Sequence, residues 1–128
     1  MKPITAEWVK KAEADFATME RESRARKNPN YDGVCFHAQQ CAEKYLKGRL
    51  CEAGIRFQPI HDLVALLEQA LAIEAGWESY RVDLAFLSDF AVGYRYPGRF
   101  ATRASAIDAR KRCRTFRLAA RQALGLRT

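Results

Sequence analysis

The residues best suited to binding an anion form a row of arginines near the C-terminal end of the sequence. Residues 99–128 contain nine Lys and Arg against one acidic residue, a net charge of +8, whereas residues 1–98 contain thirteen against fourteen, a net charge of −1. On a helix at about 100° per residue, five arginines fall within a narrow arc: Arg103, Arg110, Arg114, Arg117 and Arg121. Guanidinium groups about one helical turn apart suit successive phosphates of a nucleic acid. The alternative is a solvated basic face, two of whose arginines meet acids of a neighbouring helix.

The segment just before this row is a second candidate anion site. In Tyr94-Arg95-Tyr96-Pro97-Gly98, an arginine lies between two tyrosines and precedes the expected basic helix, and Arg99 continues the row. The free N–H groups at a helix N-terminus also favour anions, so Arg95 is a candidate phosphate ligand. An equally consistent interpretation is a structural corner in which Arg95 caps helix carbonyls.

The cysteines and histidines do not have the spacing of a metal site. No Cys-x2-Cys pair occurs among Cys35, Cys41, Cys51 and Cys113, and only two histidines exist to complete a site. His61 beside Asp62 could be an oriented general base, but a position at a helix start favours capping. His37, in a largely apolar helix, is interpreted as a hydrogen-bonded core histidine. With no nucleophile elbow, Walker loop or dinucleotide motif, we expect no metal and no cofactor.

Apolar residues recur at three- and four-residue steps along nearly the whole chain, which predicts helices and no strands. The expected helices run from Thr5, as N-cap, to before Asn28; from about Tyr31 to Ala53, closed by Gly54; from about Leu63 to Leu71; from about Glu78 to Val92; and from about Ala101 to Leu124. The second carries two apolar stripes, so we place it centrally. Short connections favour an all-α, up-and-down bundle of four to five antiparallel helices, with residues 1–128 as a single domain.

Length and composition agree with one compact domain. The 128 residues are 48% apolar and 29% charged, which excludes a disordered tail or a fibrous repeat. No apolar run approaches the ~20 residues needed to cross a bilayer, and the N-terminus lacks the apolar core of a signal peptide. We therefore expect a cytoplasmic protein without membrane contact. Ile107 and Leu118, on the side of the last helix away from the core, could mark a dimer contact.

Several of these segments occur in the order found in a known family. The expected second helix contains Cys35-Phe36-His37-Ala38-Gln39-Gln40-Cys41-Ala42-Glu43-Lys44, the third opens with His61-Asp62-Leu63, and the fourth leads into Tyr94-Arg95-Tyr96-Pro97. From about residue 6 to residue 124, the chain resembles the HEPN domain family (higher eukaryote and prokaryote nucleotide-binding domain), in particular its small stand-alone prokaryotic branch. The resemblance implies a helical bundle that is commonly a homodimer. Members of this branch are often encoded beside a minimal nucleotidyltransferase and described as its substrate- or nucleotide-binding subunit.

Other HEPN proteins are ribonucleases, and here this sequence departs from their pattern. Their active site uses an Arg followed, after about four to six residues, by a His, paired across the dimer. The Arg corresponds to Arg95, but no His follows, and Phe100 stands where one would be expected. Arg56 and His61 have the spacing but lie before the third helix, so we treat that match as coincidence. Arginine stabilises charge but cannot act as a base, so the resemblance leaves phosphate binding intact and ribonuclease activity in doubt.

These observations predict a HEPN-type module that binds a nucleotide or an RNA phosphate, as the partner or substrate-binding subunit of a minimal nucleotidyltransferase in a toxin–antitoxin-like two-component system. The predicted phosphate ligands are Arg95, Arg99, Arg103 and, from the second helix, Lys47. One alternative is a toxin endoribonuclease in which Arg95 stabilises charge and Tyr94 or Tyr96 assists. A second alternative is an interaction module whose basic helix docks an acidic partner, such as a cognate antitoxin.

Overall fold

Helices account for all the regular structure of this computed structural model, which describes residues 1–91 and 97–128. The elements are α1 (Pro3–Ser23), α2 (Tyr31–Glu52), α3 (Leu63–Ala70), the 3-10 helix η1 (Ala75–Tyr80), α4 (Arg81–Ser88) and α5 (Arg103–Ala123). The described residues form no strand, and the predicted all-α bundle is confirmed.

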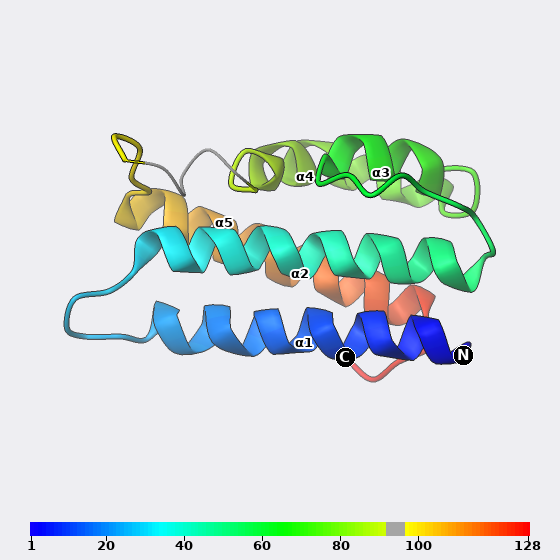
Figure 1. Cartoon of the computed structure of the whole chain (residues 1–128), viewed down its shortest axis with the longest axis horizontal. Coiled ribbons are helices and arrows are strands. Elements are labelled where there is room, and N and C mark those ends of the chain that lie inside the picture. The colour runs from blue at the N-terminus through cyan, green and yellow to red at the C-terminus, as the bar shows by residue number, and fades with distance from the viewer. Residues whose placement is uncertain (92–96) are drawn as a thin grey trace.

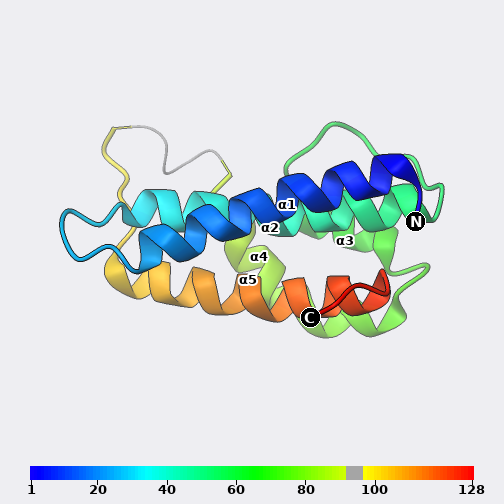
Figure 2. The same ribbon diagram turned by 90° about the horizontal axis from the view of Figure 1, so that it is seen from below.

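The second helix, α2, is the centre of the bundle. It contacts α1, α3, α4 and α5. In Figure 1, α1 runs antiparallel beside it while α3 and α4 lie along its other side, and Figure 2 shows α5 extending beneath α1 and α2. Because apolar side chains on a wide arc of α2 are buried, from Val34 to Leu50, the predicted central position is confirmed.

Two predicted helix boundaries are wrong for local reasons. α1 begins at Pro3 rather than after Thr5, and Thr5 is fully buried in the first turn. A proline fits there because the first turn does not use its missing N–H. The predicted helix from Glu78 begins instead as the 3-10 helix η1, followed by α4 from Arg81. Trp77 of η1 packs edge-on against Phe116 with ring centroids 5.0 Å apart, and this buried contact stabilises the tighter helix.

The turns at both ends of α2 follow from their sequence. Asn30 accepts a hydrogen bond from the Gly33 N–H (2.8 Å) and so caps the helix start. Gly54, just beyond the end, has φ +73°, the left-handed conformation predicted for a helix-terminating glycine.

One end of the bundle brings together the α1–α2 connection and the start of α5, away from the N-terminus (Figure 1). The Ala101 N–H donates to Asp32 Oδ1 (2.6 Å), which ties the segment before α5 to the first turn of α2. Thr102 and Ser105 then form a reciprocal capping box that starts α5. This end of the molecule therefore places residues from three helices around one surface.

Candidate phosphate-binding site

Two arginines in the middle of the α5 row, Arg110 and Arg114, face the end of α1 and share one glutamate. Arg110 donates to Glu20 from Nε to Oε1 (2.9 Å) and from Nη2 to Oε2 (3.0 Å), and Arg114 Nη1 donates to the same Oε2 (3.3 Å). Burial alone would raise the pKa of Glu20, but the bonds and charges of the two arginines outweigh it and lower that pKa. Glu20 is therefore a carboxylate at neutral pH, and it occupies donors that a phosphate would need.

The later arginines of the row converge on a second glutamate, Glu13. Arg117 donates to it from Nε (2.8 Å) and Nη2 (2.6 Å), and its guanidinium lies 4.0 Å from the centroid of the Phe16 ring. The fully buried Tyr45 of α2 donates its hydroxyl hydrogen to Glu13 and accepts a bond from Arg121 Nη1 (3.0 Å). Burial and the bond to Glu13 raise the pKa of Tyr45. This cluster joins α1, α2 and α5 through charged hydrogen bonds.

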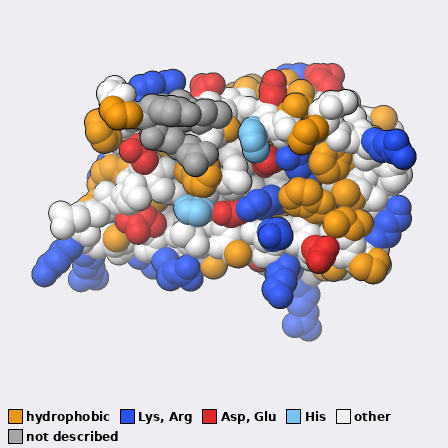
Figure 3. Space-filling view, viewed as in Figure 1, with side chains coloured by type: hydrophobic (Ala, Val, Ile, Leu, Met, Phe, Trp, Pro, Cys, Tyr) orange, Lys and Arg blue, Asp and Glu red, His pale blue; other side chains and the backbone are white. Residues whose placement is uncertain are grey.

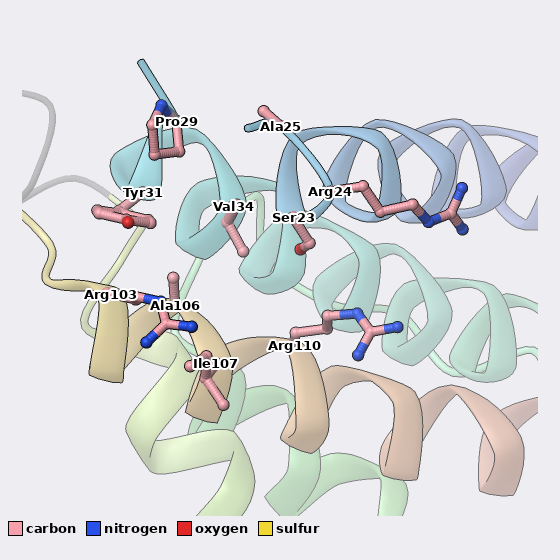
Figure 4. Close-up of a pocket in the computed structure, with 10 residues that line it drawn as sticks. All are labelled: Ser23, Arg24, Ala25, Pro29, Tyr31, Val34, Arg103, Ala106, Ile107 and Arg110. Atoms are coloured by element: carbon pink, nitrogen blue, oxygen red, sulfur yellow. The ribbon is translucent and has the colours of Figure 1, made fainter. Parts of the chain in front are cut away.

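A pocket of about 400 Å³ opens at the end of the bundle where α1 ends and where α2 and α5 begin. Figure 4 shows the end of α1, the start of α2 and the first turns of α5 around it, with Arg103 on one side and Arg24 and Arg110 on the other. Apolar side chains, including Val34 and Ile107, line the space between these arginines. The pocket thus combines cationic flanks with an apolar interior.

The three pocket arginines are not equally available to a ligand. Arg110 is engaged with Glu20, whereas the Arg24 side chain is 73% exposed and lies 3.5 Å from the same carboxylate. Arg103 is exposed, and within residues 1–91 and 97–128 no ion pair involves it. Tyr31 contributes an aromatic ring to the lining. Exposed guanidinium donors beside a tyrosine and an apolar wall match the chemistry of a phosphate attached to a nucleobase.

Comparison with known proteins identifies the family. The sequence profile of the HEPN domain matches residues 5–122. The chain belongs to the HEPN domain family. Two solved structures share its fold: TT1696 from Thermus thermophilus (TM-score 0.80, 20% identity, 93% of this chain and 97% of that one) and ST0689, an archaeal HEPN homologue (TM-score 0.73, 25% identity, 95% and 98%). A comparison with curated protein sequences gives no significant match.

In this HEPN protein, the predicted phosphate ligands fall in different environments. Arg95 lies outside the described residues. Arg99 is exposed in the segment before α5, and Arg103 lines the pocket. Lys47 is 6% exposed, pairs with Glu43 at 3.0 Å, and does not line the pocket, so our proposal does not include it. The free N-terminal donors expected on α5 are partly used, because the Ser105 N–H donates to Thr102 Oγ1 (3.0 Å).

Sequence reasoning missed the contribution of the α1–α2 connection to this site. Four of the seven residues from Arg21 to Lys27 are basic, but the acidic residues elsewhere in residues 1–98 hid this cluster in the net charge. Arg24 lies within it and lines the pocket opposite the start of α5. A local count of charge would have found the cluster, but its position beside Arg103 is a result of helix packing.

The described residues of the HEPN chain also bear on metal and membrane binding. Within residues 1–91 and 97–128, no group of three or more His, Cys, Asp or Glu side chains could hold a metal ion. Over the same residues, no helix has the length and apolar character required to traverse a bilayer. The four cysteines, all in the described part of the chain, are free thiols, and Cys35, Cys41 and Cys113 are buried.

Proposed function

We propose that this HEPN protein is a binding module for a nucleotide or an RNA phosphate, with its site in the pocket between α1, α2 and α5. The observation that carries the proposal is that Arg24 and Arg103 line opposite sides of one pocket, which also contains Tyr31 and several apolar side chains. Both guanidinium groups are exposed, so binding does not require breaking a buried ion pair. Each charge-assisted contact to a phosphate contributes about 1.5–3 kcal/mol.

The hydrogen bonds of the α5 row support a phosphate site in the pocket and not along the row. Four of its five arginines are hydrogen-bonded to Glu20, Glu13 or Tyr45, whereas Arg103 at the head of the row bonds to none of these three. A phosphate along the row would have to compete with carboxylates already in place, while a phosphate in the pocket would meet solvent-exposed donors. The row therefore positions α1 against α5, and the pocket is the proposed point of anion contact.

We further propose that the module works as the partner or substrate-binding subunit of a minimal nucleotidyltransferase, in a two-component system of the toxin–antitoxin kind. Membership of the HEPN family supports this role. The exposed Leu118 on α5 (44%) supports a homodimer, since an apolar side chain exposed in one chain can be buried by a second copy. Ile107, exposed by 56%, lies about three turns earlier on α5 and lines the pocket.

Binding of a fluorescent single-stranded RNA and of a fluorescent ATP analogue, measured by polarisation at low and high salt, tests the pocket. The Arg24→Gln/Arg103→Gln protein should bind about a hundredfold more weakly, because it loses two contacts that each contribute about a factor of ten. The matched control is Lys10→Gln/Lys11→Gln, which removes the same charge from exposed positions of α1 outside the pocket. Equal affinities of the two folded double variants would refute the assignment, since net charge alone would then account for binding.

A further inference from the structure

Phe100, in the segment that leads into α5, is an aromatic side chain that the fold leaves on the surface. It is 75% exposed, whereas every other aromatic side chain within residues 1–91 and 97–128 is buried or half-buried. Figure 3 shows hydrophobic side chains exposed at this end of the molecule, over the same segment. A phenyl ring in this position contributes little to the core, and its surface is accessible to a planar ligand.

The backbone that carries this ring is anchored directly after it. The next residue, Ala101, donates its N–H to Asp32 Oδ1 at the start of α2 (2.6 Å). Thr102 and Ser105 then bond to each other reciprocally and fix the first turn of α5. Because the backbone is already ordered, the ring loses less conformational freedom when it stacks on a ligand.

Phe100 lines a hollow of about 350 Å³ that adjoins the arginine pocket. Residues 28–32, at the end of the α1–α2 connection and the start of α2, form its other side. Pro29 and Tyr31 line both the hollow and the pocket, so the two spaces meet at these residues. Figure 4 shows Pro29 and Tyr31 at the end of the pocket where Arg103 lies. A ligand with an anionic part beside Arg103 therefore has a second space next to it, with an aromatic wall.

Asp32 gives this hollow a hydrogen-bond acceptor. The bond from Ala101 uses Oδ1, and Oδ2 takes no part in that bond. A carboxylate accepts hydrogen bonds and donates none, so Asp32 suits a group that carries hydrogens and repels a carbonyl oxygen. Cytosine presents an exocyclic amino group where uracil presents a carbonyl oxygen, and aspartate accepts from that amino group in known base recognition. The hollow thus combines a stacking surface with an acceptor that distinguishes these two bases.

We propose that the hollow is a nucleobase subsite, in which a base bearing an exocyclic amino group stacks on Phe100 and donates to Asp32 Oδ2. This inference rests on the proposed function, because it takes the phosphate of the same nucleotide to lie in the pocket beside Arg24 and Arg103. Tyr31, packed against the core, forms the wall between the phosphate and the base. The pocket selects for negative charge, and the hollow selects which base the nucleotide carries.

Competition against a fluorescent single-stranded RNA, followed by polarisation, tests the acceptor with cytidine 5′-monophosphate and uridine 5′-monophosphate. Wild type should bind the cytidine nucleotide about tenfold more tightly, because the uridine nucleotide lacks the amino donor. In Asp32→Asn, the Ala101 N–H still requires an acceptor and holds the amide oxygen, so the amide NH2 faces the base. This variant should prefer the uridine nucleotide, a reversal that a purely structural role of Asp32 would not produce.

The same assay tests the stacking surface. Phe100→Leu keeps an apolar side chain but lacks an aromatic face, and it should bind both nucleotides about tenfold more weakly. Phe100→Trp should restore their binding, and ribose 5-phosphate, which has no base, should bind wild type and Phe100→Leu equally. The matched control is Val82→Ala, which changes an exposed apolar side chain of α4 and should leave all affinities unchanged.

The base subsite and the phosphate pocket can fail separately. Equal affinity of wild type for both nucleotides and ribose 5-phosphate, or unchanged nucleotide affinities in Phe100→Leu, would overturn the base subsite and leave the pocket standing. Wild-type affinity of Arg24→Gln/Arg103→Gln for ribose 5-phosphate would instead refute the pocket. If Asp32→Asn does not fold, the Phe100 variants decide the question, because that side chain is mostly exposed.

Fluorescent oligocytidylate and oligouridylate then distinguish RNA from a free nucleotide as the source of the base. Tighter binding of oligocytidylate than of cytidine 5′-monophosphate would identify RNA, and equal binding would identify the free nucleotide. Both results support the subsite when cytosine is preferred over uracil, and the absence of that preference in both forms would overturn it.

Discussion

Neutralising Glu13 separates a structural role of the α5 arginines from a ligand-binding one. In Glu13→Gln, the side chain keeps its size but loses the charge that accepts both bonds of Arg117 and lies 3.6 Å from Arg121. The Arg117 and Arg121 side chains are only 19% and 15% exposed, so water solvates their charges poorly once the carboxylate is lost. Tyr45, which is fully buried, also loses its charged acceptor.

The expected cost follows from these exposures. Breaking a fully buried ion pair costs about 3–5 kcal/mol, and the 31% exposure of Glu13 reduces this, so we expect a loss of about 2–3 kcal/mol. For a domain of this size, that corresponds to a fall in Tm of about 6–12 °C. Urea denaturation followed by circular dichroism measures the free energy, with an unchanged m-value showing that the unfolded state is comparable.

The matched control is Glu78→Gln, which neutralises a glutamate that also receives two bonds from one arginine, Arg81, but on the surface. We expect no measurable loss of stability in Glu78→Gln, because water solvates the Arg81 guanidinium when its exposed partner loses its charge. Equal midpoints for the two variants would refute the structural role of the row. Arg117→Gln completes the test, since it should reduce stability without weakening RNA binding.

Two further predictions concern pH and assembly. The folded-state pKa of both Glu13 and Glu20 lies below the ordinary value of 4.5, because arginine bonds outweigh burial, so the unfolded chain binds more protons in acid. The stabilisation from these two ionised glutamates is present above about pH 4.5 and is lost as pH falls through their folded-state pKa values. The urea midpoint should therefore decrease as pH falls below 4.5, and it should decrease less steeply in Glu13→Gln. Equal pH dependence of the midpoint in wild type and Glu13→Gln would contradict this assignment. Light scattering after size exclusion should give the mass of a dimer for wild type and of a monomer for Leu118→Asp. Val82→Asp, at a 71% exposed apolar position of α4, should remain dimeric, and a monomeric wild type would refute the contact.

The sequence determined the elements and the family, because both depend on local patterns. A helix repeats every 3.6 residues, so the spacing of apolar side chains was enough to predict the all-α fold and the central position of α2. The order of motifs pointed to the HEPN family, which the profile over residues 5–122 confirms. The predicted start of the first helix was wrong, since Thr5 has the character of a capping residue but lies buried in a helix that begins at Pro3.

Tertiary structure decided which charges remain available. The sequence placed Arg110 and Arg117 on one face of α5 but could not show that this face meets Glu20 and Glu13 of α1. It likewise gave no sign that Arg24 lies across a pocket from Arg103. Periodicity fixes the direction of a side chain around its own helix, whereas its partner depends on which helix packs there and in what register. The same basic residues therefore act as structural ion pairs along α5 and as a proposed anion site at its start.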